Sequence, residues 1–539
     1  MQSFKHLIRD HFDRHAEQRS AYFQRNICYH QQVIDACRQF LNPDSRVLEL
    51  GCSTGELLAA LQPAQGVGVD LSPRSIEQAQ ARHPCYTWIV GDMEALPDHP
   101  ALAQPFDLVI VEDSVTYLYD VQVFLQTIKR FMHPGSRLVI SSWNWLWQPI
   151  LRLGERLRIK VPDLDIRENW ISTSSLENLL ILADYEVLSV QPGVLIPYDL
   201  GLLSDVVNSL SYAPLVRRLT LLSLLVARPL YPDPAARRQY SVSVIIPTRN
   251  ERGNIQALVE RTPEMGSHTE LIFVDGSSSD GTVEEIHRWM TLRPDRDIRF
   301  LAQEEAQDEL TPPNLMLKKG KGDAVRKGFS AARGDVLMIL DSDISVAPED
   351  MTRFYEVLAS GKARFANGTR FTYEFESAAM KPLNKLGNVF FSLAFTWLLG
   401  QRITDTLCGT KALFREDYER IAANRAHFGN FDPFGDFDLI FGAAWLGLPM
   451  IDVPVRYLAR TYGESKVRVS KHGPLLGRMS LIALWHFKIR PLLDGQRRAT
   501  INPAHAHQPS ASSNSASERR AWWLIGMALL LLTLLWRRK

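Results

Sequence analysis

The stretch DVLMILDSD, Asp335–Asp343, decides the fold of the second half of this chain. Its middle is apolar at every position, which is typical of a strand buried on both faces in a mostly parallel sheet. The strand runs directly into two carboxylates, Asp341 and Asp343, separated by one residue. Such carboxylates, on the turn that leaves a strand, can share one Mg²⁺ or Mn²⁺ ion, whose remaining positions are filled by phosphate oxygens. Because an isolated Asp-x-Asp triplet is common on protein surfaces, the surrounding sequence must decide its meaning.

Apolar strand-like runs alternate with helical patterns on both sides of this stretch. Around it stand SVSVIIPT from Ser241, ELIFVDGSSSDGT from Glu270 and ARFANGTRF from Ala363. An earlier block has the same pattern in RVLELG, GVGVDL, YTWIVGD, FDLVIVED and RLVISSW, between Arg46 and Trp143. Alternation of this kind predicts mostly parallel, doubly wound sheets. Since the turn motifs of the two blocks differ, the sequence predicts an α/β protein with two different doubly wound domains and a C-terminal apolar helix.

The chain has 539 residues, too many for a single hydrophobic core. We predict an N-terminal helical segment at 1–43, a first α/β domain at 44–192, an apolar segment and linker at 193–240, a second α/β domain at 241–495, a low-complexity linker at 496–520 and an apolar helix at 521–536.

The composition excludes some classes of protein. The net charge of +1 argues against general nucleic-acid binding, which usually leaves a strongly basic footprint. The five cysteines contain no Cys-x-x-Cys pair, so free thiols are favoured over a disulfide or zinc framework. The N-terminal MQSFKHLIRDHF lacks an apolar run, and we therefore expect no secretory signal there.

The C-terminal run AWWLIGMALLLLTLLW, Ala521–Trp536, contains no charged residue. As a helix it would span about 24 Å, against about 30 Å for the hydrocarbon core of a bilayer. Tryptophans at both of its edges suit the membrane interfaces, and the flanking Arg and Lys side chains can make up the missing length. We predict a single membrane anchor. An interfacial or re-entrant helix and burial within the protein are the alternatives, and basic residues at both ends leave the orientation open.

The first block carries a glycine-bearing turn, VLELGCSTGELLAAL, between a strand and a helix. Gly51 and Gly55 let the backbone turn tightly and approach a ligand, while the helix offers its N-terminal amides. Asp70 ends the next strand, where a carboxylate can accept both hydroxyls of a ribose. Glu49 before the turn and Asp92 in VGDMEALP make this pattern more specific than a glycine turn alone.

In these residues the block resembles the class I S-adenosylmethionine-dependent methyltransferases, from about Arg46 to Val190. The resemblance implies a Rossmann-like fold and this cofactor, with Glu49, Gly51 and Gly55 around its methionine part, Asp70 on the ribose, and Asp92 and Met93 beside the adenine. One departure is Ser53, which stands where that family commonly has a glycine. A nicotinamide cofactor and a retained fold that binds nothing are the alternatives.

The methyl acceptor is less constrained by the sequence. Glu112 and Asp113 follow a strand and should lie at the mouth of the sheet. An acceptor pocket could be lined by Tyr117, Trp143, Trp145 and Trp147, although aromatic residues at such spacing are more often core. Because methyl transfer from a sulfonium mainly requires alignment of the acceptor, no residue of this block is assigned as catalytic.

The second block contains three further motifs beside the Asp-x-Asp stretch: SVIIPTRNE, FVDGSSSDGT and KGKGDAVRKGFSAARGD. Together they resemble glycosyltransferase family 2, in the branch of dolichol-phosphate mannose synthases and bacterial polyprenyl-phosphate glycosyltransferases. The resemblance runs through most of 241–466 and implies a GT-A fold, a nucleotide-diphosphate sugar as donor and a single inverting displacement at the anomeric carbon.

The same resemblance implies the roles of individual residues. The nucleoside would be held by Pro247, Arg249, Glu251 and Asp275, with Lys321 and Asp323 near the nucleotide. Asp341 and Asp343 would be catalytic residues that bind the metal and the diphosphate. Where many members have two adjacent acids, this chain has Asp275 followed by Gly276, a departure that bears on recognition of the base.

Other motifs concern the acceptor. DTLCGTK, Asp405–Lys411, and GDFDL, with Asp436 and Asp438, resemble acceptor-side segments of the family, and RTYGESK resembles its R-x-x-G-x-S-K signature. In RTYGESK, a fork, a hydroxyl and a point charge would come from Arg460, Ser465 and Lys466, a set that suits a phosphate. Arg370, in NGTRF, could add a fourth contact. A solvated run of charges is the alternative for RTYGESK.

A phosphate acceptor also fits the chemistry. Phosphate monoesters lose their second proton near pH 6, so the nucleophile is largely anionic at neutral pH and needs alignment more than a general base. If the acceptor were a hydroxyl, Asp436 or Asp438 would have to take a proton. The sequence does not separate these roles.

Two internal runs are more apolar than surface helices need to be, Leu386–Gly400 and Leu475–Phe487. They are either core helices or helices in the headgroup region, with Arg478 and Lys488 toward lipid phosphates. The sequence thus predicts a membrane-associated enzyme whose catalytic domains face the cytoplasm and whose acceptor is polyprenyl phosphate or a related lipid. The alternative is transfer to a polysaccharide or soluble acceptor, with the N-terminal domain as a non-catalytic binding module.

Overall fold

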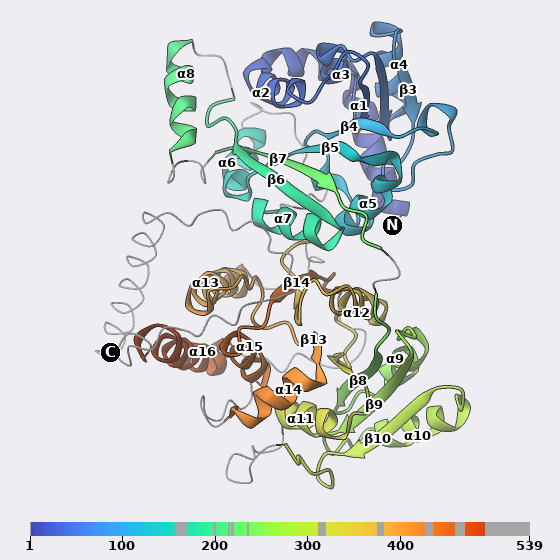
Figure 1. The fold of residues 1–539 in the computed structure, drawn as a ribbon, viewed down its shortest axis with the longest axis vertical. Helices are drawn as coiled ribbons and strands as arrows, with labels where there is room; N and C mark the ends of the chain where they lie inside the picture. The colour runs from blue at the N-terminus through green and yellow to red at the C-terminus, as the bar shows by residue number, and fades with distance from the viewer. Residues whose placement is uncertain are drawn as a thin grey trace. The chain divides into compact units, whose positions relative to one another are not determined.

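The chain divides into two compact units, Met1–Pro232 and Asp233–Lys539, each built around its own seven-stranded sheet (Figure 1). The computed structural model describes residues 2–156, 169, 171–197, 201–213, 216, 220–233, 237–310, 320–373, 382–425, 435–458 and 469–490. The predicted apolar helix at 521–536 and the motif RTYGESK lie outside these described residues.

The strands of the first sheet are β1 (Arg46–Leu50), β2 (Gln65–Asp70), β3 (Thr87–Val90), β4 (Phe106–Val111), β5 (Met132–Trp143), β6 (Tyr185–Pro192) and β7 (Leu222–Pro229). Their order in space is β3-β2-β1-β4-β5-β7-β6. Parallel pairing runs from β3 to β5, whereas β7 is antiparallel to both of its neighbours. The prediction of an α/β sheet is confirmed. The sheet is mixed because β7 runs antiparallel to its neighbours.

Strand β7 extends the first unit beyond the predicted boundary at residue 192. Its residues fall in the segment 193–240, which we expected to lie outside both domains, yet they occupy the space between β5 and β6. Almost every side chain of β7 is buried, because the strand has a neighbour on each side and apolar residues on both faces.

The helices of the first unit are α1 (Gln2–Arg25), α2 (Ile27–Arg38), α3 (Glu56–Leu61), α4 (Pro73–Arg82), α5 (Val121–Ile128), α6 (Gln148–Arg156), α7 (Thr173–Leu182) and α8 (Leu202–Ser209). Local capping explains where several begin. At the start of α4, the Ser72 hydroxyl accepts a hydrogen bond from the Ser75 amide, and Pro73 occupies the first helical position. At the start of α5, the Asp120 side chain accepts a hydrogen bond from the Val123 amide. One hydrophobic core joins α2 and α3 to β1, β4 and β7.

The strands of the second sheet are β8 (Ser241–Thr248), β9 (His268–Asp275), β10 (Asp297–Ala302), β11 (Val336–Ile339), β12 (Phe365–Thr369), β13 (Lys411–Phe414) and β14 (Met450–Pro454). Their order is β10-β9-β8-β11-β13-β12-β14, and only β13 runs antiparallel to its neighbours. Strand β11 is fully buried, as the DVLMILDSD stretch predicted.

The helices of the second unit are α9 (Ile255–Arg261), α10 (Thr282–Leu292), α11 (Lys321–Ala331), α12 (Met351–Ala359), α13 (Pro382–Leu399), α14 (Arg415–Ala423), α15 (Gly435–Trp445) and α16 (Val469–Leu484), the last continued by a π-helical turn at Trp485–Ile489. In Figure 1, α13, α15 and α16 gather at one end of this unit, away from β10 and α10. A core cluster joins α11, α13, α15 and α16 to the central strands.

The two apolar runs that we expected as core or headgroup helices form α13 and α16 with its π-helical turn. Both helices bury one face, through residues such as Phe395 and Phe487. Both also expose large apolar side chains, including Leu393 at 50% and Trp485 at 48%. Among the described residues, no helix is both long enough and apolar enough to cross a membrane.

Candidate functional site

A pocket opens at the carboxyl ends of β1, β2 and β4 in the first unit. Four of the predicted cofactor residues line it, namely Gly51, Asp70, Asp92 and Met93. Helices α1 and α2 form its other wall, with side chains that include Phe12, Arg19, Tyr22, Phe23 and His30. The topology brings these groups together because the carboxyl ends of parallel strands meet at one edge of the sheet.

The glycine turn after β1 has the backbone of a tight ligand loop. Gly51 has φ +76°, and a Cβ atom there would lie inside van der Waals contact of Ser114 Oγ. Ser53, the departure from the family pattern, has φ +49°, a left-handed conformation that costs energy for a residue other than glycine. Its amide donates to Asp70 Oδ2 at 2.9 Å. Ser53 lines the pocket, and its hydroxyl is buried without a hydrogen-bond partner among the described residues.

Asp70 is fixed by the backbone around it. Its Oδ2 accepts from Ser53 and its Oδ1 accepts from the amide of Ser72 at 2.8 Å. Burial raises the pKa of Asp70, and the two backbone hydrogen bonds lower it in part. The carboxylate therefore holds the turn after β1 against the turn after β2, at the place where the sequence predicted a ribose contact.

Glu49 and Gly55 lie behind this wall and do not line the pocket. Glu49 is buried and accepts a hydrogen bond from the Leu58 amide of α3 at 3.1 Å. Burial, together with the charge of Glu112, raises its pKa well above the usual range. Gly55 begins α3 with φ +85°, and Trp88 occupies the space that a Cβ atom would need. Glu49 and Gly55 thus support the glycine turn after β1 from behind the residues that line the pocket.

Helix α1 closes the pocket on the side of Asp92. Lys5 Nζ lies 2.9 Å from Asp92 Oδ1 and also contacts Glu94. Glu94 in turn accepts from the amides of Tyr119 and Asp120 at 3.0 and 2.7 Å. The helix is thus tied across the pocket by ion pairs, a feature that the sequence did not predict.

At the other end of the pocket, Glu112 and Asp113 stand after β4 as predicted. Asp113 has φ +51°, and its two oxygens accept from the hydroxyls of Tyr29 and Ser141, the latter at 2.7 Å. Trp143 Nε1 donates to the Tyr29 hydroxyl at 2.9 Å. Burial and the charge of Glu112 raise the pKa of Asp113 to about 6. Tyr117 and Trp143 line the pocket, whereas Trp147 packs against the core.

In the second unit the Asp-x-Asp pair lies where β11 ends beside β8. The Leu340 amide donates to the Ile245 carbonyl at 3.0 Å, and Ser342 Oγ donates to the Pro247 carbonyl at 2.7 Å. Asp343 Oδ1 accepts from the Ser345 amide at 3.0 Å. Between them Ile344 has φ +53°, which is rare for a β-branched residue and typical of strained functional turns.

Three predicted motifs meet at Asp341. Lys321, the first residue of α11, places its Nζ 2.5 Å from Asp341 Oδ1. The Asp341 and Lys321 side chains are 23% and 40% exposed, so both can reach a ligand. Gly409 of DTLCGTK lies so close that a Cβ atom there would clash with both groups. The glycine is therefore required by the close approach of its backbone to this ion pair.

The predicted nucleoside residues stand on adjacent strand ends. The register of β8 and β9 pairs Pro247 with Val274 and Thr248 with Asp275, and the exposed Arg249 follows. Asp275 is buried, and its oxygens accept from the Ser278 amide at 2.9 Å and hydroxyl at 2.5 Å. Its carboxylate thus orders the turn after β9.

Two further predicted residues have internal partners. Glu251 accepts from Asn254 Nδ2 at 2.8 Å, at the start of α9. Asp323 is buried in the first turn of α11, where it accepts from Gln303 Nε2 at 2.7 Å and lies 3.2 Å from Lys327 Nζ. Asp323 therefore joins α11 to the segment after β10, while Lys321 on the same helix faces Asp341.

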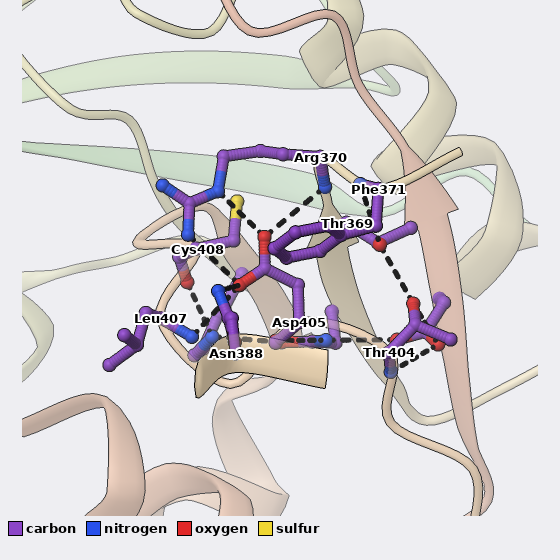
Figure 2. A network of polar contacts seen from close by, with 11 residues as sticks. Thr369, Arg370, Phe371, Asn388, Thr404, Asp405, Leu407 and Cys408 are labelled. Atoms are coloured by element: carbon purple, nitrogen blue, oxygen red, sulfur yellow. Dashed lines mark hydrogen bonds and ion pairs between the residues drawn. The ribbon is translucent and has the colours of Figure 1, made fainter. Parts of the chain in front are cut away.

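Arg370, predicted as a contact for the acceptor phosphate, forms a bidentate pair with Asp405 (Figure 2). Its Nε and Nη2 lie 2.6 and 3.0 Å from the two carboxylate oxygens. Asp405 is fully buried and also accepts from the Leu407 amide at 3.0 Å. Burial alone would raise the pKa of Asp405, but the charge of Arg370 and the hydrogen bonds from Arg370 and Leu407 together outweigh it, and the net shift is downward.

The pair belongs to a larger buried network. Asn367 Nδ2 donates to the Asp405 carbonyl at 3.0 Å and to Asp452 Oδ1 at 2.9 Å. Lys411 Nζ, also buried, donates to Asn367 Oδ1 at 2.8 Å and to the Cys408 carbonyl at 2.7 Å. The network holds the segment 405–411 on β12 and β14 and so fixes Gly409 beside Asp341.

Asp438, one of two candidate bases, is buried on α15 and accepts from Arg425 Nε at 2.6 Å. Burial raises its pKa although Arg425 opposes the shift. The side chain of Asp436 and the residues Arg460, Ser465 and Lys466 lie outside what the structure describes.

Fold and sites together define two kinds of unit. One has a cofactor-type pocket at a glycine turn, and the other has the partly exposed Asp341 carboxylate beside the Lys321 ammonium group at the carboxyl edge of its sheet. Family models agree with this division. Residues 17–190 match a methyltransferase domain, and residues 243–421 match glycosyl transferase family 2. The chain carries a methyltransferase domain followed by a glycosyltransferase family 2 domain.

Individual proteins show the same likeness. The chain is 34% identical to a dolichol-phosphate mannosyltransferase of Saccharomyces cerevisiae, over 24% of this chain and 44% of that protein. It is 29% identical to a polyprenol monophosphomannose synthase of Mycolicibacterium smegmatis, over 49% of this chain and 94% of that protein. The first relative is thus spanned over less than half its length.

One solved structure is similar to part of the chain. Magnesium protoporphyrin IX methyltransferase from Synechocystis PCC 6803, with bound SAH, is 16% identical over 42% of this chain and 99% of that one, with a TM-score of 0.31.

Proposed function

We propose that the second domain transfers a sugar from a nucleotide diphosphate to the phosphate of a polyprenyl lipid, with a divalent metal ion. The observation that carries this proposal is the meeting of Asp341, Lys321 and Gly409 at the end of β11. The names of the relatives, a dolichol-phosphate mannosyltransferase and a polyprenol monophosphomannose synthase, support the class of acceptor.

The residues around Asp341 fit a Mg²⁺ or Mn²⁺ ion shared with a diphosphate. Among the described residues no cluster of three or more His, Cys, Asp or Glu side chains could hold a metal ion by itself. An ion held by Asp341 and Asp343 would therefore take its other ligands from the diphosphate and water, the usual arrangement for Mg²⁺. When bound, it would neutralise the charge that develops on the leaving diphosphate. Lys321 would add a point charge to the same phosphates.

The displacement itself needs little from the protein beyond alignment. A bond forms between a phosphate oxygen of the lipid and the anomeric carbon, while the bond from that carbon to the diphosphate breaks. Because the acceptor is already anionic at neutral pH, no general base is required. The ion pair of Asp438 with Arg425 fits a supporting role for that carboxylate.

On the acceptor side we assign direct phosphate contacts to Arg460, Ser465 and Lys466. Arg370 is committed to Asp405. Its role in the proposal is to hold the segment 405–411 beside Asp341.

Membrane association is part of the proposal. The exposed apolar side chains of α13 and α16, including Phe390, Leu393, Leu481 and Trp485, suit contact with lipid. The apolar run 521–536 would anchor the chain, with both domains on the cytoplasmic side.

The acceptor class is tested with purified full-length protein, Mn²⁺ and radiolabelled nucleotide sugars. Label should enter the organic phase with polyprenyl phosphate and not with polyprenol, which lacks the phosphate. Label transferred to free sugars or polysaccharide instead would favour the alternative acceptor class.

Deleting Ala521–Lys539 should release most of the protein from membranes without lowering its melting temperature, because the segment follows the last strands of both sheets in the sequence. Sedimentation with vesicles measures this. If the truncated protein still sediments fully, α13 and α16 carry the attachment and the anchor prediction is wrong.

For the first domain we propose that S-adenosylmethionine binds in the pocket at Gly51. Asp70 would accept from the ribose, and Asp92 and Met93 would flank the adenine. The unpartnered hydroxyl of Ser53 supports a polar ligand at this turn.

Replacing Gly51 by Ala should abolish binding of S-adenosylmethionine, because the new Cβ collides with Ser114 at a positive φ. The matched control is Gly201→Ala, which adds the same Cβ atom at a positive φ where no atom lies within 4 Å, and it should retain binding. Calorimetric titration of both variants and the wild type measures the effect. Equal affinity of Gly51→Ala and wild type would contradict a cofactor site at this turn.

A further inference from the structure

His30 on α2 is held in the pocket of the first unit from two sides. Its Nδ1 lies 2.9 Å from Glu112 Oε1, and its ring stacks on Phe23 with centroids 4.0 Å apart and an interplanar angle of 17°. Glu112 and Phe23 also line the pocket. The orientation of the imidazole is therefore fixed by a carboxylate and an aromatic face.

His30 lines the pocket, and its second ring nitrogen is not fully buried. Within the part of the chain that the structure describes, Nε2 of His30 has no hydrogen-bond partner and is not among the buried unsatisfied atoms. In a neutral imidazole whose Nδ1–H donates to a carboxylate, Nε2 carries the lone pair. The arrangement presents a base to whatever occupies the space between α1, α2 and the cofactor turn.

The neighbouring carboxylate is less suited to this task. Both oxygens of Asp113 already accept hydroxyl groups, from Tyr29 and Ser141, and Tyr29 is itself held by Trp143. These contacts brace the α2 segment that carries His30 against the end of β4. Asp113 and Tyr29 are therefore positioning residues.

The charges that face His30 come from several elements. Glu112 and Asp113 follow β4, Glu56 begins α3, and Arg19 and His15 of α1 line the same pocket. Burial lowers the pKa of His30, but the three carboxylates, Glu112 above all, outweigh it and the net shift is upward. A base whose pKa lies near the working pH is the effective kind.

We propose that His30, oriented by Glu112, is the general base of the first domain and that its methyl acceptor is a hydroxyl group. This inference rests on the proposed binding of S-adenosylmethionine at Gly51. In the step, the acceptor oxygen forms a bond to the methyl carbon and the bond from that carbon to the sulfonium sulfur breaks, which leaves S-adenosylhomocysteine. The hydroxyl proton passes to Nε2 of His30 and then to solvent.

Among acceptors that carry no positive charge, a hydroxyl is the one that this arrangement serves best. A carboxylate is already ionised at neutral pH and needs no base, and thiols ionise near that pH on their own. Hydroxyl groups hold their protons, so a positioned base accelerates the transfer by about 10²–10⁴-fold. Phenols and sugar hydroxyls share this chemistry. The aromatic side chains of Phe12 and Tyr117 also line the pocket and can pack against either kind of ring.

The test uses full-length wild-type protein and the variants His30→Asn and Glu112→Gln, with His133→Asn as a control at a partly exposed histidine of β5. Asparagine can keep the donor to Glu112 but has no base at the Nε2 position. Methyl transfer from radiolabelled S-adenosylmethionine is measured with a phenol, a methyl glycoside, a primary amine and a carboxylic acid. Calorimetry gives cofactor affinity, and ¹⁵N-histidine spectra give the pKa of His30.

We expect transfer to the phenol or the glycoside, at least about 100-fold slower in His30→Asn with unchanged cofactor affinity, and unaffected in His133→Asn. In wild type, kcat/KM should rise with pH through the pKa of His30, since the base must be neutral. In Glu112→Gln, the pKa of His30 measured by NMR should fall. The rise of kcat/KM with pH should move to lower pH by the same amount.

Transfer only to the amine or the acid, or a His30→Asn variant with wild-type rate and pH profile, would overturn the assignment while the cofactor site stands. Wild-type protein that binds no S-adenosylmethionine would overturn the cofactor site as well.

Discussion

Replacing Asp343 by Asn is expected to slow sugar transfer by about 10³-fold, with the fold unchanged. The carboxylate stands at the end of β11 next to Asp341, where the proposed metal ion and diphosphate would bind, and an amide is a neutral and weaker ligand. Mn²⁺-dependent binding of the nucleotide should weaken in parallel. Steady-state transfer to polyprenyl phosphate and calorimetry with the nucleoside diphosphate, with and without Mn²⁺, measure the two effects.

The matched control is Asp335→Asn, at the opposite end of the same stretch. Asp335 accepts from the amide and hydroxyl of Ser241 at 3.0 and 2.7 Å, and an asparagine oxygen can accept both bonds. Transfer should remain near wild type in this variant. Unchanged turnover in Asp343→Asn would show that the carboxylate is not a metal ligand.

Replacing Asp405 by Asn should destabilise the second unit by about 3–5 kcal/mol, because it leaves the buried Arg370 without its counter-charge. The expected fall in melting temperature is about 10 °C, measured by calorimetry. Asp295→Asn, at an exposed pair with Arg293, is the control and should leave the melting temperature unchanged.

A double variant separates structure from phosphate binding. Arg370→Met with Asp405→Asn removes both charges together and keeps a side-chain oxygen that can accept from the Leu407 amide, so that no uncompensated charge is left buried. We expect it to recover most of the melting temperature that Asp405→Asn loses. If Asp405→Asn has the melting temperature of the wild type, the pair does not stabilise this unit. That result would favour the original prediction that Arg370 contacts the phosphate directly.

The same pair contributes to acid sensitivity. Arg370 lowers the pKa of Asp405 in the folded chain. The stabilisation of the fold by the ionised Asp405 is therefore fully present above the ordinary aspartate pKa of about 4. It is lost as the pH falls through the lowered, folded-state pKa.

Much of the fold could be predicted from local pattern alone. Strand β11 was recognisable because all its residues are apolar and the chain then turns at carboxylates. Strand β7 was missed because its run lies inside a longer apolar segment without a clear turn, and only pairing with β5 and β6 places it in the sheet. Its position depends on contacts that no local period encodes.

The sites divide in the same way. Asp341 and Lys321 belong to motifs, and the parallel sheet brings those motifs to one edge. Arg370 was predicted as a fourth phosphate contact beside RTYGESK. Its partner Asp405 lies 35 residues further along the chain, and no spacing rule predicts the pair. His30 lies in an ordinary amphipathic helix, and only the packing of α2 against the end of β4 brings it to Glu112.

Sugar transfer to a lipid phosphate is tested most directly by mass spectrometry of the organic phase after full-length protein is incubated with Mn²⁺, polyprenyl phosphate and a panel of nucleotide sugars. One donor should yield a polyprenyl phosphate heavier by a single sugar residue, and the product should disappear with Asp343→Asn. Products confined to the aqueous phase with every donor, while the wild-type protein still consumes nucleotide sugar, would contradict a lipid phosphate as the acceptor.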